Sequence, residues 1–422
     1  MREITLKFAA AAFFALLAGC ASTPPAGADP VFAVVGAAVV DPAVDGPPVK
    51  RDVLIEGDRI AIVGRNVKIP RGARRIDATG KYLTPGLWDS HAHFNALTDV
   101  GSAPEIYVGY GVLHARDMGG DFSTLQALRA AIERGERIGP TLFIAGPTLN
   151  GQQAAPFHRV TGNEAEARAA VRELSAAGVD FIKTHRRTSR EAFFAMIDEA
   201  RKHSLGVYGH VPLGVGWIEA SGAGMRSFEH IFTVLENELA DPADPAKSIE
   251  EALARIDGER GDAIFQAMAT KDVYLCPTLV AFERSIPFPP ELSDAKREGF
   301  THLLDYVGRA RKFSVPILAG SDAAEAPGQS LIRELELLVD AGLTSREALA
   351  SATTAPAQLL GRPDLASIVK GSQATFLILD ADPTRDVTAL RGVNAVVLRG
   401  RVLRRDELAR FRELTAPVET PQ

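Results

Sequence analysis

Short apolar runs alternate with longer amphipathic stretches through the middle of the chain, from about residue 86 to residue 360. Most of the runs end in polar residues, as buried strands of a parallel sheet do. They cover residues 86–94, 112–118, 141–146, 180–185, 206–211, 227–231, 274–280 and 315–322. Helical patterns lie between most of them, for example at residues 164–177, 190–203 and 331–341. Eight strands alternating with helices predict an α/β fold, a (β/α)₈ TIM-like barrel.

Two of the predicted helices begin with the same tetrapeptide, Thr188-Ser189-Arg190-Glu191 and Thr344-Ser345-Arg346-Glu347. Each tetrapeptide fits a capping box, in which the hydroxyl and the Glu side chain satisfy free backbone N–H groups of the first turn. We therefore expect both helices to start at these positions.

Both ends of the chain resemble each other more than they resemble the middle. Short β-rich segments occur at residues 31–40, 52–56 and 59–63, with Glu56-Gly57-Asp58 as hairpin turn, and again at 374–380 and 395–399. Neither end shows a long helical pattern. We expect one small β-sandwich domain built from both chain ends, residues 31–85 and 363–410, around a barrel over 86–362, with a tail over 411–422.

The N-terminus has the features of an export signal. Arg2 and Lys7 precede an apolar run over residues 8–18, which is too short to span a bilayer. The run closes in Leu17-Ala18-Gly19-Cys20, which resembles a bacterial lipoprotein signal cut before Cys20 and lipidated on its sulfur. Residues 1–19 are then the signal peptide and 20–30 a tether, and the protein is expected in the periplasm or at the cell surface, anchored to the outer membrane. An ordinary signal peptide, in which Cys20 is incidental, is the alternative.

The charge and cysteine content of the chain limit the classes of partner that it can bind. The net charge is −6 and no basic run lies outside the N-terminus, so nucleic-acid binding has no electrostatic support. The chain has 2 cysteines, Cys20 and Cys276, so lipidation of Cys20 leaves no internal disulfide. The expected partners are a small-molecule substrate and, through the lipid, a membrane; the oligomeric state stays open.

Six polar residues stand near the carboxyl ends of predicted strands. His91 and His93 are two residues apart on one strand, so their imidazoles share a face. In a barrel the carboxyl ends of all strands meet at one mouth, and buried charge there would be costly without a purpose. Metal ligation neutralises it, which predicts a metal site at His91, His93, Lys183, His210, His230 and Asp322.

These motifs resemble a known family. The opening Thr84-Pro85-Gly86-Leu87-Trp88-Asp89-Ser90-His91-Ala92-His93 is similar to that of the amidohydrolase superfamily of metal-dependent hydrolases. The ordered set of six resembles its binuclear, carboxylated-lysine subtype. Ala115-Arg116-Asp117-Met118-Gly119-Gly120 and Cys276-Pro277-Thr278-Leu279 resemble the branch of imidazolonepropionase-like proteins and Xaa-Pro-type dipeptidases. The resemblance covers nearly all of the chain after the tether.

The resemblance implies roles for these residues. His91, His93 and Asp322 would hold one divalent ion and His210 and His230 a second, with Lys183 carboxylated to bridge them. Zinc is the expected metal, with manganese, cobalt and iron as alternatives. The function implied is hydrolysis of an amide-type carbon–nitrogen bond in a dipeptide, N-acyl amino acid or cyclic amide. A metal-bridging hydroxide would attack, and Asp322 would transfer its proton.

Candidate substrate residues are His185, two residues beyond Lys183, and His158, in a loop after the third predicted strand. Arg186 and Arg187 are candidates for a substrate carboxylate, although adjacent arginines are more often solvated.

Three other functions compete with amide hydrolysis. A lactonase or other esterase could use the same site, because attack by hydroxide does not require nitrogen. A non-catalytic binding lipoprotein could keep the fold. A one-metal deaminase of the superfamily usually has Glu three residues after the fifth-strand His, where this chain has Leu213.

Overall fold

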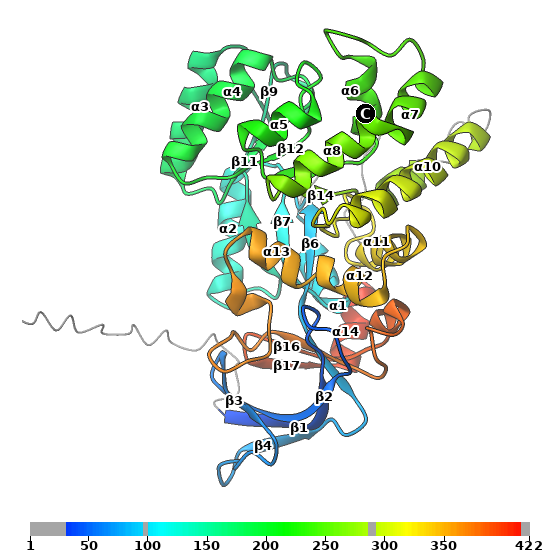
Figure 1. The fold of residues 1–422 in the computed structure, drawn as a ribbon. Helices are drawn as coiled ribbons and strands as arrows, with labels where there is room; N and C mark the ends of the chain where they lie inside the picture. Colours follow the sequence, from blue (N-terminus) through cyan, green and yellow to red (C-terminus); the bar gives the residue numbers. More distant parts are fainter. Residues whose placement is uncertain (1–30, 96–99, 286–292, 415–422) are drawn as a thin grey trace, which may run out of the picture.

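The computed structural model describes residues 31–95, 100–285 and 293–414 (Figure 1). The predicted signal peptide and tether, with Cys20, lie outside these residues, as does most of the predicted tail. Among the described residues, no helix is long and apolar enough to cross a membrane.

An eight-stranded sheet is built from both ends of the chain, in the order β17-β16-β15-β5-β1-β2-β3, with β4 paired to β1. The strands are β1 (Val31–Val39), β2 (Val49–Glu56), β3 (Arg59–Gly64), β4 (Arg74–Asp77), β5 (Tyr82–Pro85), β15 (Phe376–Leu379), β16 (Val393–Leu398) and β17 (Arg401–Arg404). The ends meet where β5 pairs antiparallel with β15, and Leu83 lies opposite Ile378. Phe32, Ile55 and Phe376 are among its buried core residues. Figure 1 shows this sheet at the end of the molecule away from α3 to α8.

The hairpin of β2 and β3 turns where the sequence predicts it. Glu56 pairs with Arg59, and Gly57 between them has a φ of 59°, a left-handed conformation that glycine adopts without steric cost. The C-terminal half differs from expectation, because residues 405–412 form a helix, α14 (Arg405–Arg412), which packs on α1 (Ala103–Gly109). Its short apolar pattern, with only Leu408 fully buried, is too brief to stand out in the sequence.

The middle of the chain contains two parallel sheets. One has the order β6-β7-β8 and the other β10-β9-β11-β12-β13-β14. Their strands are β6 (Leu87–Ala92), β7 (Val112–Asp117), β8 (Thr141–Ile144), β9 (Thr148–Asn150), β10 (His158–Val160), β11 (Ile182–Thr184), β12 (Val207–Gly209), β13 (Ser227–Glu229) and β14 (Tyr274–Cys276). Seven of these correspond to predicted strands; the three-residue strands β9 and β10 were not predicted, because their segments carry no alternating pattern.

The eighth predicted strand, at 315–322, is not a strand in the structure. Its residues make one isolated bridge, Ile317 to Leu275 of β14. Backbone hydrogen bonds still hold the segment on both sides: Leu318 N–H donates to Leu275 O over 2.8 Å, and Ser90 N–H of β6 donates to Ala319 O over 2.9 Å. Pro316 lacks a backbone donor and Asp322 has a positive φ, so the segment follows its neighbours without a regular ladder.

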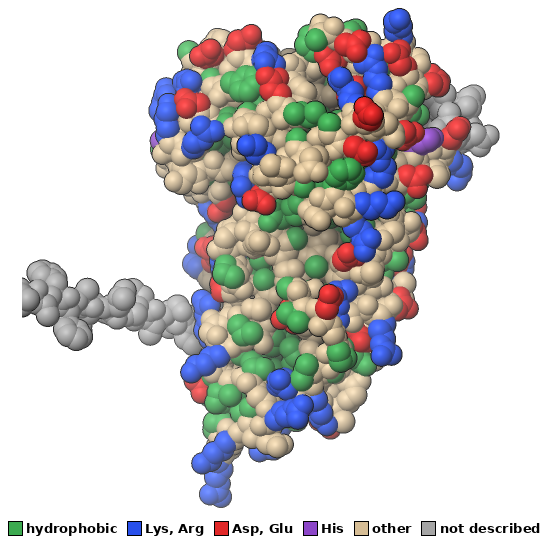
Figure 2. All heavy atoms as spheres, in the orientation of Figure 1, with side chains coloured by type: hydrophobic (Ala, Val, Ile, Leu, Met, Phe, Trp, Pro, Cys, Tyr) green, Lys and Arg blue, Asp and Glu red, His purple; other side chains and the backbone are tan. Residues whose placement is uncertain are grey.

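Helices separate the parallel strands. They are α1, α2 (Phe122–Glu133), α3 (Glu164–Ala177), α4 (Arg190–Lys202), α5 (Trp217–Ala223), α6 (Thr233–Leu239), α7 (Ile249–Asp257), α8 (Glu259–Thr270), α9 (Leu279–Ser285), α10 (Ser293–Lys312), α11 (Gln329–Asp340), α12 (Ser345–Ser351) and α13 (Thr354–Leu359). The long connection after β13 holds α6, α7 and α8. On the face in Figure 2, acidic and basic side chains are interspersed over these upper helices.

The two identical tetrapeptides cap their helices in different registers. Thr344 and Glu347 form the predicted capping box at α12. At α4 the cap is Ser189, which accepts from Ala192 N–H, and no reciprocal Glu contact completes a box. Thr188 is buried, and its hydroxyl donates to Leu149 O of β9 over 3.3 Å, so it is not free to cap. Tertiary contacts thus shift the cap by one residue.

Candidate metal centre

The six predicted ligand residues lie at one end of the parallel strands. His91 and Lys183 are within β6 and β11, and His93 follows β6 directly. His210 and His230 each stand one residue past β12 and β13. The six residues span 231 positions of the sequence, from His91 to Asp322, and all of them line one cavity of about 240 Å³.

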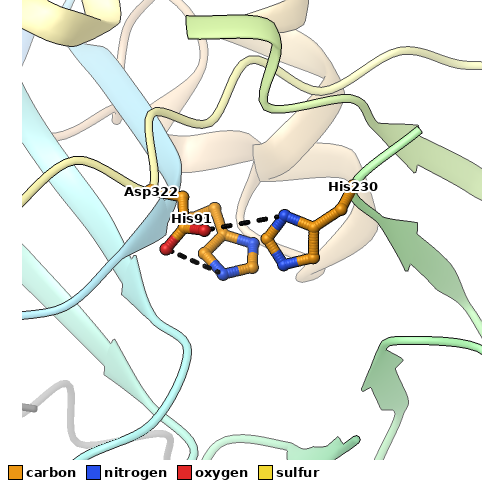
Figure 3. A group of neighbouring side chains, drawn as sticks. All are labelled: His91, His230 and Asp322. Carbon is orange, nitrogen blue, oxygen red and sulfur yellow. Dashed lines mark ion pairs between the residues drawn. The ribbon is translucent and has the colours of Figure 1, made fainter. Parts of the chain in front are cut away.

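Asp322 is the centre of this group. Its Oδ1 lies 3.6 Å from His91 Nε2 and 3.4 Å from His93 Nε2, and its Oδ2 lies 3.6 Å from His230 Nδ1. Figure 3 shows the Asp322 carboxylate facing the rings of His91 and His230, which come from different strands. One carboxylate and three imidazoles are a donor set that binds divalent transition metals.

Lys183 and His210 complete the group on its other side. Lys183 Nζ lies 3.5 Å from His91 Nε2 and the side chain is buried. His210 packs with its ring centroid 4.5 Å from that of His230, and its Nδ1 is a buried atom with no hydrogen-bond partner among the described residues. A buried, unpartnered imidazole nitrogen beside the other ligand residues fits a metal ligand, because an unmet polar atom is otherwise costly.

Backbone conformations at the strand ends aim these side chains. His230, Thr278 and Asp322 have φ values of 64°, 49° and 47°, which non-glycine residues rarely adopt. Such strain persists only where the surroundings enforce it, and it gathers at functional sites. Gly320 allows the close approach of the Asp322 segment, because a Cβ there would lie 2.5 Å from Cys276 Sγ and 2.7 Å from His91 Cβ.

Each of three imidazoles is held through its Nδ1. That of His91 lies 2.9 Å from Glu229 Oε2, that of His93 2.9 Å from Gly119 O, and that of His230 2.8 Å from Thr278 Oγ1. Acceptors at Nδ1 of His91 and His93 place an N–H there, so Nε2 is the nitrogen of each ring that faces Asp322. The orientation suits metal ligation, in which the outer nitrogen of a ligating His usually donates to a carboxylate or carbonyl.

A buried arginine supports the carboxylate that holds His91. Arg116 donates from Nη2 to Glu229 Oε1 over 2.7 Å, from Nη1 to Ser227 Oγ over 3.0 Å and from Nε to Ser90 O over 2.6 Å. Its guanidinium also lies over the Tyr208 ring, 5.1 Å from the centroid. The Arg116–Glu229 pair is almost fully buried, so each charge depends on the other.

Electrostatics favour neutral His91 and His230 and a charged Asp322, whereas the pKa of His93 is raised, because the Asp322 carboxylate outweighs the effect of burial. Burial, followed by the nearby Lys183, holds the pKa of His91 well below its ordinary value, and burial lowers the pKa of His230 to about 4. Burial raises the pKa of Asp322. The hydrogen bond with His93 and the charges of His230, His93 and Lys183 lower it by more, so the net shift is downward. Neutral imidazoles and an ionised carboxylate are the protonation states that ligate metals.

Burial also lowers the pKa of Lys183 to about 8, with Glu229 and Asp322 opposing the shift. A larger fraction of the amine is then uncharged at neutral pH than for an ordinary lysine.

A second carboxylate, that of Asp89, connects β6 to the segment that carries Asp322. Asp89 of β6 accepts from Ser321 Oγ over 2.6 Å and from Ser321 N–H over 2.9 Å. It also accepts from His91 N–H, and burial raises its pKa to about 6. Asp89 therefore ties the residue next to Asp322 to the strand that carries His91.

Glu229, Arg116, Asp89 and Thr278 were not predicted to be functional from the sequence. A signal was present for two of them: Arg116 and Glu229 are charged residues inside predicted strands, where an unpaired charge would be expensive. The pairing itself is invisible in the sequence, since 113 positions separate them.

The remaining candidate residues fall into two groups, those that line the cavity and those that do not. His185 and His158 line the cavity, their rings 4.8 Å apart, and His185 lies 4.3 Å from His210. Arg186 is paired with Glu236 over 2.8 Å and Arg187 is exposed, and neither lines the cavity. His114 packs against Trp88 in the core with the two rings tilted, and His203 and His302 lie near Glu199 and Asp257 on outer helices.

Comparison with known proteins gives the family. The model of the amidohydrolase family matches residues 82–403, more than half of the chain. The chain belongs to the amidohydrolase family. Members are metal-dependent, and the predicted resemblance is confirmed. Ochratoxinase of Aspergillus niger is 24% identical over 421 residues, covering 83% of this chain and 82% of that protein. Imidazolonepropionase of Streptomyces coelicolor is 24% identical over 365 residues, covering 78% and 85%.

The fold of this amidohydrolase is shared with solved structures. A Xaa-Pro dipeptidase with bound methionine in its active site superposes with a TM-score of 0.71 at 21% identity, covering 89% of this chain and 100% of that one. The family and these relatives place the chain in the imidazolonepropionase and dipeptidase branch, as predicted, and identify it as a hydrolase acting on carbon–nitrogen bonds.

Proposed function

We propose that this amidohydrolase cleaves an amide-type bond of a small molecule, such as a dipeptide, N-acyl amino acid or cyclic amide, with two divalent metal ions, zinc by preference. His91, His93 and Asp322 would hold one ion and His210 and His230 the other. The observation that carries the proposal is the approach of one Asp322 carboxylate to imidazole nitrogens of His91, His93 and His230, at 3.4 to 3.6 Å. When bound, the metals would supply a hydroxide at neutral pH and polarise the carbonyl.

Lys183 is proposed to be carboxylated. An ammonium has donors only and cannot ligate a cation, whereas a carbamate offers two anionic oxygens. Formation of the carbamate requires an uncharged amine, which the low pKa of Lys183 provides. Carbon dioxide adds to Nζ, a new nitrogen–carbon bond forms and one proton leaves.

Asp322 is proposed to move the proton. Net hydrolysis forms a carbon–oxygen bond, breaks the carbon–nitrogen bond and delivers a proton to the leaving nitrogen. The Asp322 carboxylate faces the imidazoles of the other predicted ligands, and its lowered pKa keeps it ionised, the form that can accept a proton. The hydrogen bonds to Glu229, Gly119 and Thr278 hold the imidazoles fixed meanwhile.

Two further parts of the proposal concern the rest of the chain. The two parallel sheets and the segment between β14 and β6 are proposed to close into the (β/α)₈ barrel, supported by the backbone hydrogen bonds of Leu318 and Ser90.

Export and lipidation at Cys20 are proposed from the N-terminal sequence alone. Incorporation of a labelled fatty acid that disappears in Cys20→Ala would test the anchor.

Metal content and Lys183 chemistry test the proposal together. Protein reconstituted with zinc in the presence of bicarbonate should hold two ions per chain and lose turnover on chelation. Lys183→Ala should hold fewer ions and regain part of its activity with short carboxylic acids, which replace the carbamate oxygens. Lys202→Ala, a solvent-side lysine on α4, is the matched control and should behave as wild type. Two bound ions in Lys183→Ala, with full activity, would contradict the bridging role.

A further inference from the structure

A buried carboxyl group that the proposed mechanism does not use lies on α11, which packs on α9. The Glu334 side chain is fully buried, and its Oε2 accepts from Val280 N–H over 2.8 Å. Leu279 N–H is a second donor to the same group, and burial raises the pKa of Glu334 to about 8. At neutral pH the side chain is therefore mostly an uncharged acid, which still accepts hydrogen bonds through an oxygen.

The two N–H groups that Glu334 binds belong to the first turn of α9. Leu279 and Val280 begin this helix, and the N–H groups of a first turn have no partner within the helix. The residue before a helix usually supplies the acceptor, and threonine with an extended backbone is a preferred residue there. Thr278 stands at this position, but its φ is 49° and its hydroxyl lies 2.8 Å from His230 Nδ1 instead. The side chain of Glu334, from another helix, thus takes the place of the local cap.

The turn before α9 is attached to His230 at two points. His230 N–H donates to Cys276 O over 2.9 Å, and the Thr278 hydroxyl contacts the imidazole ring. His230 and Thr278 both have positive φ values, 64° and 49°, and such conformations persist only where the surroundings enforce them. Glu334 contributes to this enforcement, because it fixes the two N–H groups that directly follow Thr278.

We propose that Glu334 is a positioning residue of the metal centre: by holding the first turn of α9 it fixes Thr278, and through the Thr278 hydroxyl it fixes the ring of His230. The hydrogen bonds of Glu334 go to the backbone of α9 and to none of the six predicted ligands. The proposal rests on the proposed function, in which His230 and His210 hold the second ion. It also gives a role to the motif Cys276-Pro277-Thr278-Leu279, which the proposed mechanism leaves unused.

Two substitutions of Glu334 separate positioning from general support of the fold. Glu334→Gln keeps an oxygen acceptor for Val280 N–H, whereas Glu334→Leu leaves that buried N–H unpaired. In full-length protein loaded with cobalt(II), chelator competition should show affinity for the second ion at least about tenfold lower in Glu334→Leu. Affinity in Glu334→Gln should stay close to wild type, and the first ion should be affected less than the second in both variants.

Glu199→Leu is the matched control, because it removes a buried carboxylate from the outer helix α4. This control should bind both ions as wild type does, even if its Tm falls. A lowered Tm with unchanged second-ion affinity in Glu334→Leu would show that Glu334 supports the fold only, and would overturn the proposal.

A double-mutant cycle tests the route through Thr278. Thr278→Val removes the hydroxyl and keeps the shape of the side chain, so it should also weaken the second ion. Because Glu334 is proposed to act through this hydroxyl, adding Glu334→Leu to Thr278→Val should cost no further second-ion affinity. Fully additive losses would overturn the route.

A shorter acid covers the case in which Glu334→Leu does not fold. The carboxyl group of Glu334→Asp is one methylene short of Val280 N–H, so this variant should also bind the second ion more weakly. Wild-type affinity in Glu334→Asp would overturn the positioning role and leave the proposed function intact. Wild-type protein that binds one ion only would overturn the proposed function, and this inference with it.

Discussion

Glu229 Oε2 lies 2.9 Å from His91 Nδ1, and both side chains are buried. Glu229 is in turn held by Arg116, whose guanidinium has no other acidic partner among the described side chains. The contact fixes which nitrogen of His91 carries the proton, and so leaves Nε2 as the free lone pair facing Asp322 and Lys183. A carboxylate that touches no substrate thereby positions a proposed metal ligand.

Glu229→Gln should weaken metal binding. With Gln at this position, His91 faces either a neutral amide oxygen or an NH₂ group in place of the charged carboxylate. Arg116 also loses its ion-pair partner. We expect metal affinity to fall ~10–100-fold, measured by chelator competition. Glu199→Gln is the control, because Glu199 is a buried carboxylate paired with Arg168 and Arg172 on outer helices. If both variants bound metal alike, Glu229 would have only a structural role.

Asp322→Asn should abolish most turnover. The amide cannot accept a proton and is a poor metal ligand, so kcat should fall by ~10²–10⁴. Circular dichroism and Tm should change little, because Asp322 is partly exposed at the cavity. Asp380→Asn, which removes the carboxylate that follows β15 and pairs with Lys81, should leave kcat unchanged. Activity within a few-fold of wild type in Asp322→Asn would refute the proton-transfer role.

We expect the stability of the protein to depend on pH through Glu334 on α11. Burial raises its pKa to about 8 from the ordinary 4.5, and the donors Val280 N–H and Leu279 N–H only partly oppose this shift. Between pH 4.5 and about 8 the folded state keeps a proton that the unfolded chain releases, so the free energy of unfolding falls as pH rises through this window. Above it the folded protein carries a buried carboxylate.

Glu334→Gln should remove this dependence. Its amide oxygen can still accept from Val280, and it has no proton to lose. The Tm of the variant relative to wild type should therefore rise by on the order of 5 °C between about pH 5 and pH 8.5. Glu336→Gln, two residues along the same helix and paired with Arg391 at the surface, should show no such trend. A constant Tm difference across the range would mean that Glu334 is ionised throughout.

Gly320→Ala should disturb both the fold and the site. The new methyl group would meet Cys276 Sγ and the backbone and Cβ of His91, none of which can move freely. We expect a loss of ~1–3 kcal/mol in stability, together with loss of metal affinity as Asp322 shifts. Gly392→Ala is a matched control, because a Cβ there meets nothing within 4 Å. Normal metal binding and stability in Gly320→Ala would show that the Asp322 segment adjusts without cost.

Much of the fold follows from local pattern. The strand around His91 and the helices α3 and α4 were predicted within about one or two residues, because each has a clear apolar period and a cap or glycine at its end. Elements without such a pattern were missed: β9 and β10 have three residues each, and α14 has eight. The segment ending in Asp322 was predicted as a strand because its residues are apolar, but Pro316 and the turn at Asp322 prevent a regular ladder.

The sequence by itself determined the family of the chain and predicted which residues form its site. His91, His93, Lys183, His210, His230 and Asp322 stand at the ends of strand-like runs, and parallel strands bring such ends together whatever the details of packing. What holds those side chains was decided only by the tertiary structure. From the sequence, Glu229 and Arg116 are two isolated charges, and only the packing of β7 and β13 in one core shows that they form a pair. Thr188 is likewise predicted as a helix cap, but in the structure its hydroxyl donates to Leu149 O of β9. Hydrogen bonds between distant residues depend on distances that no local pattern encodes, because the whole core sets them.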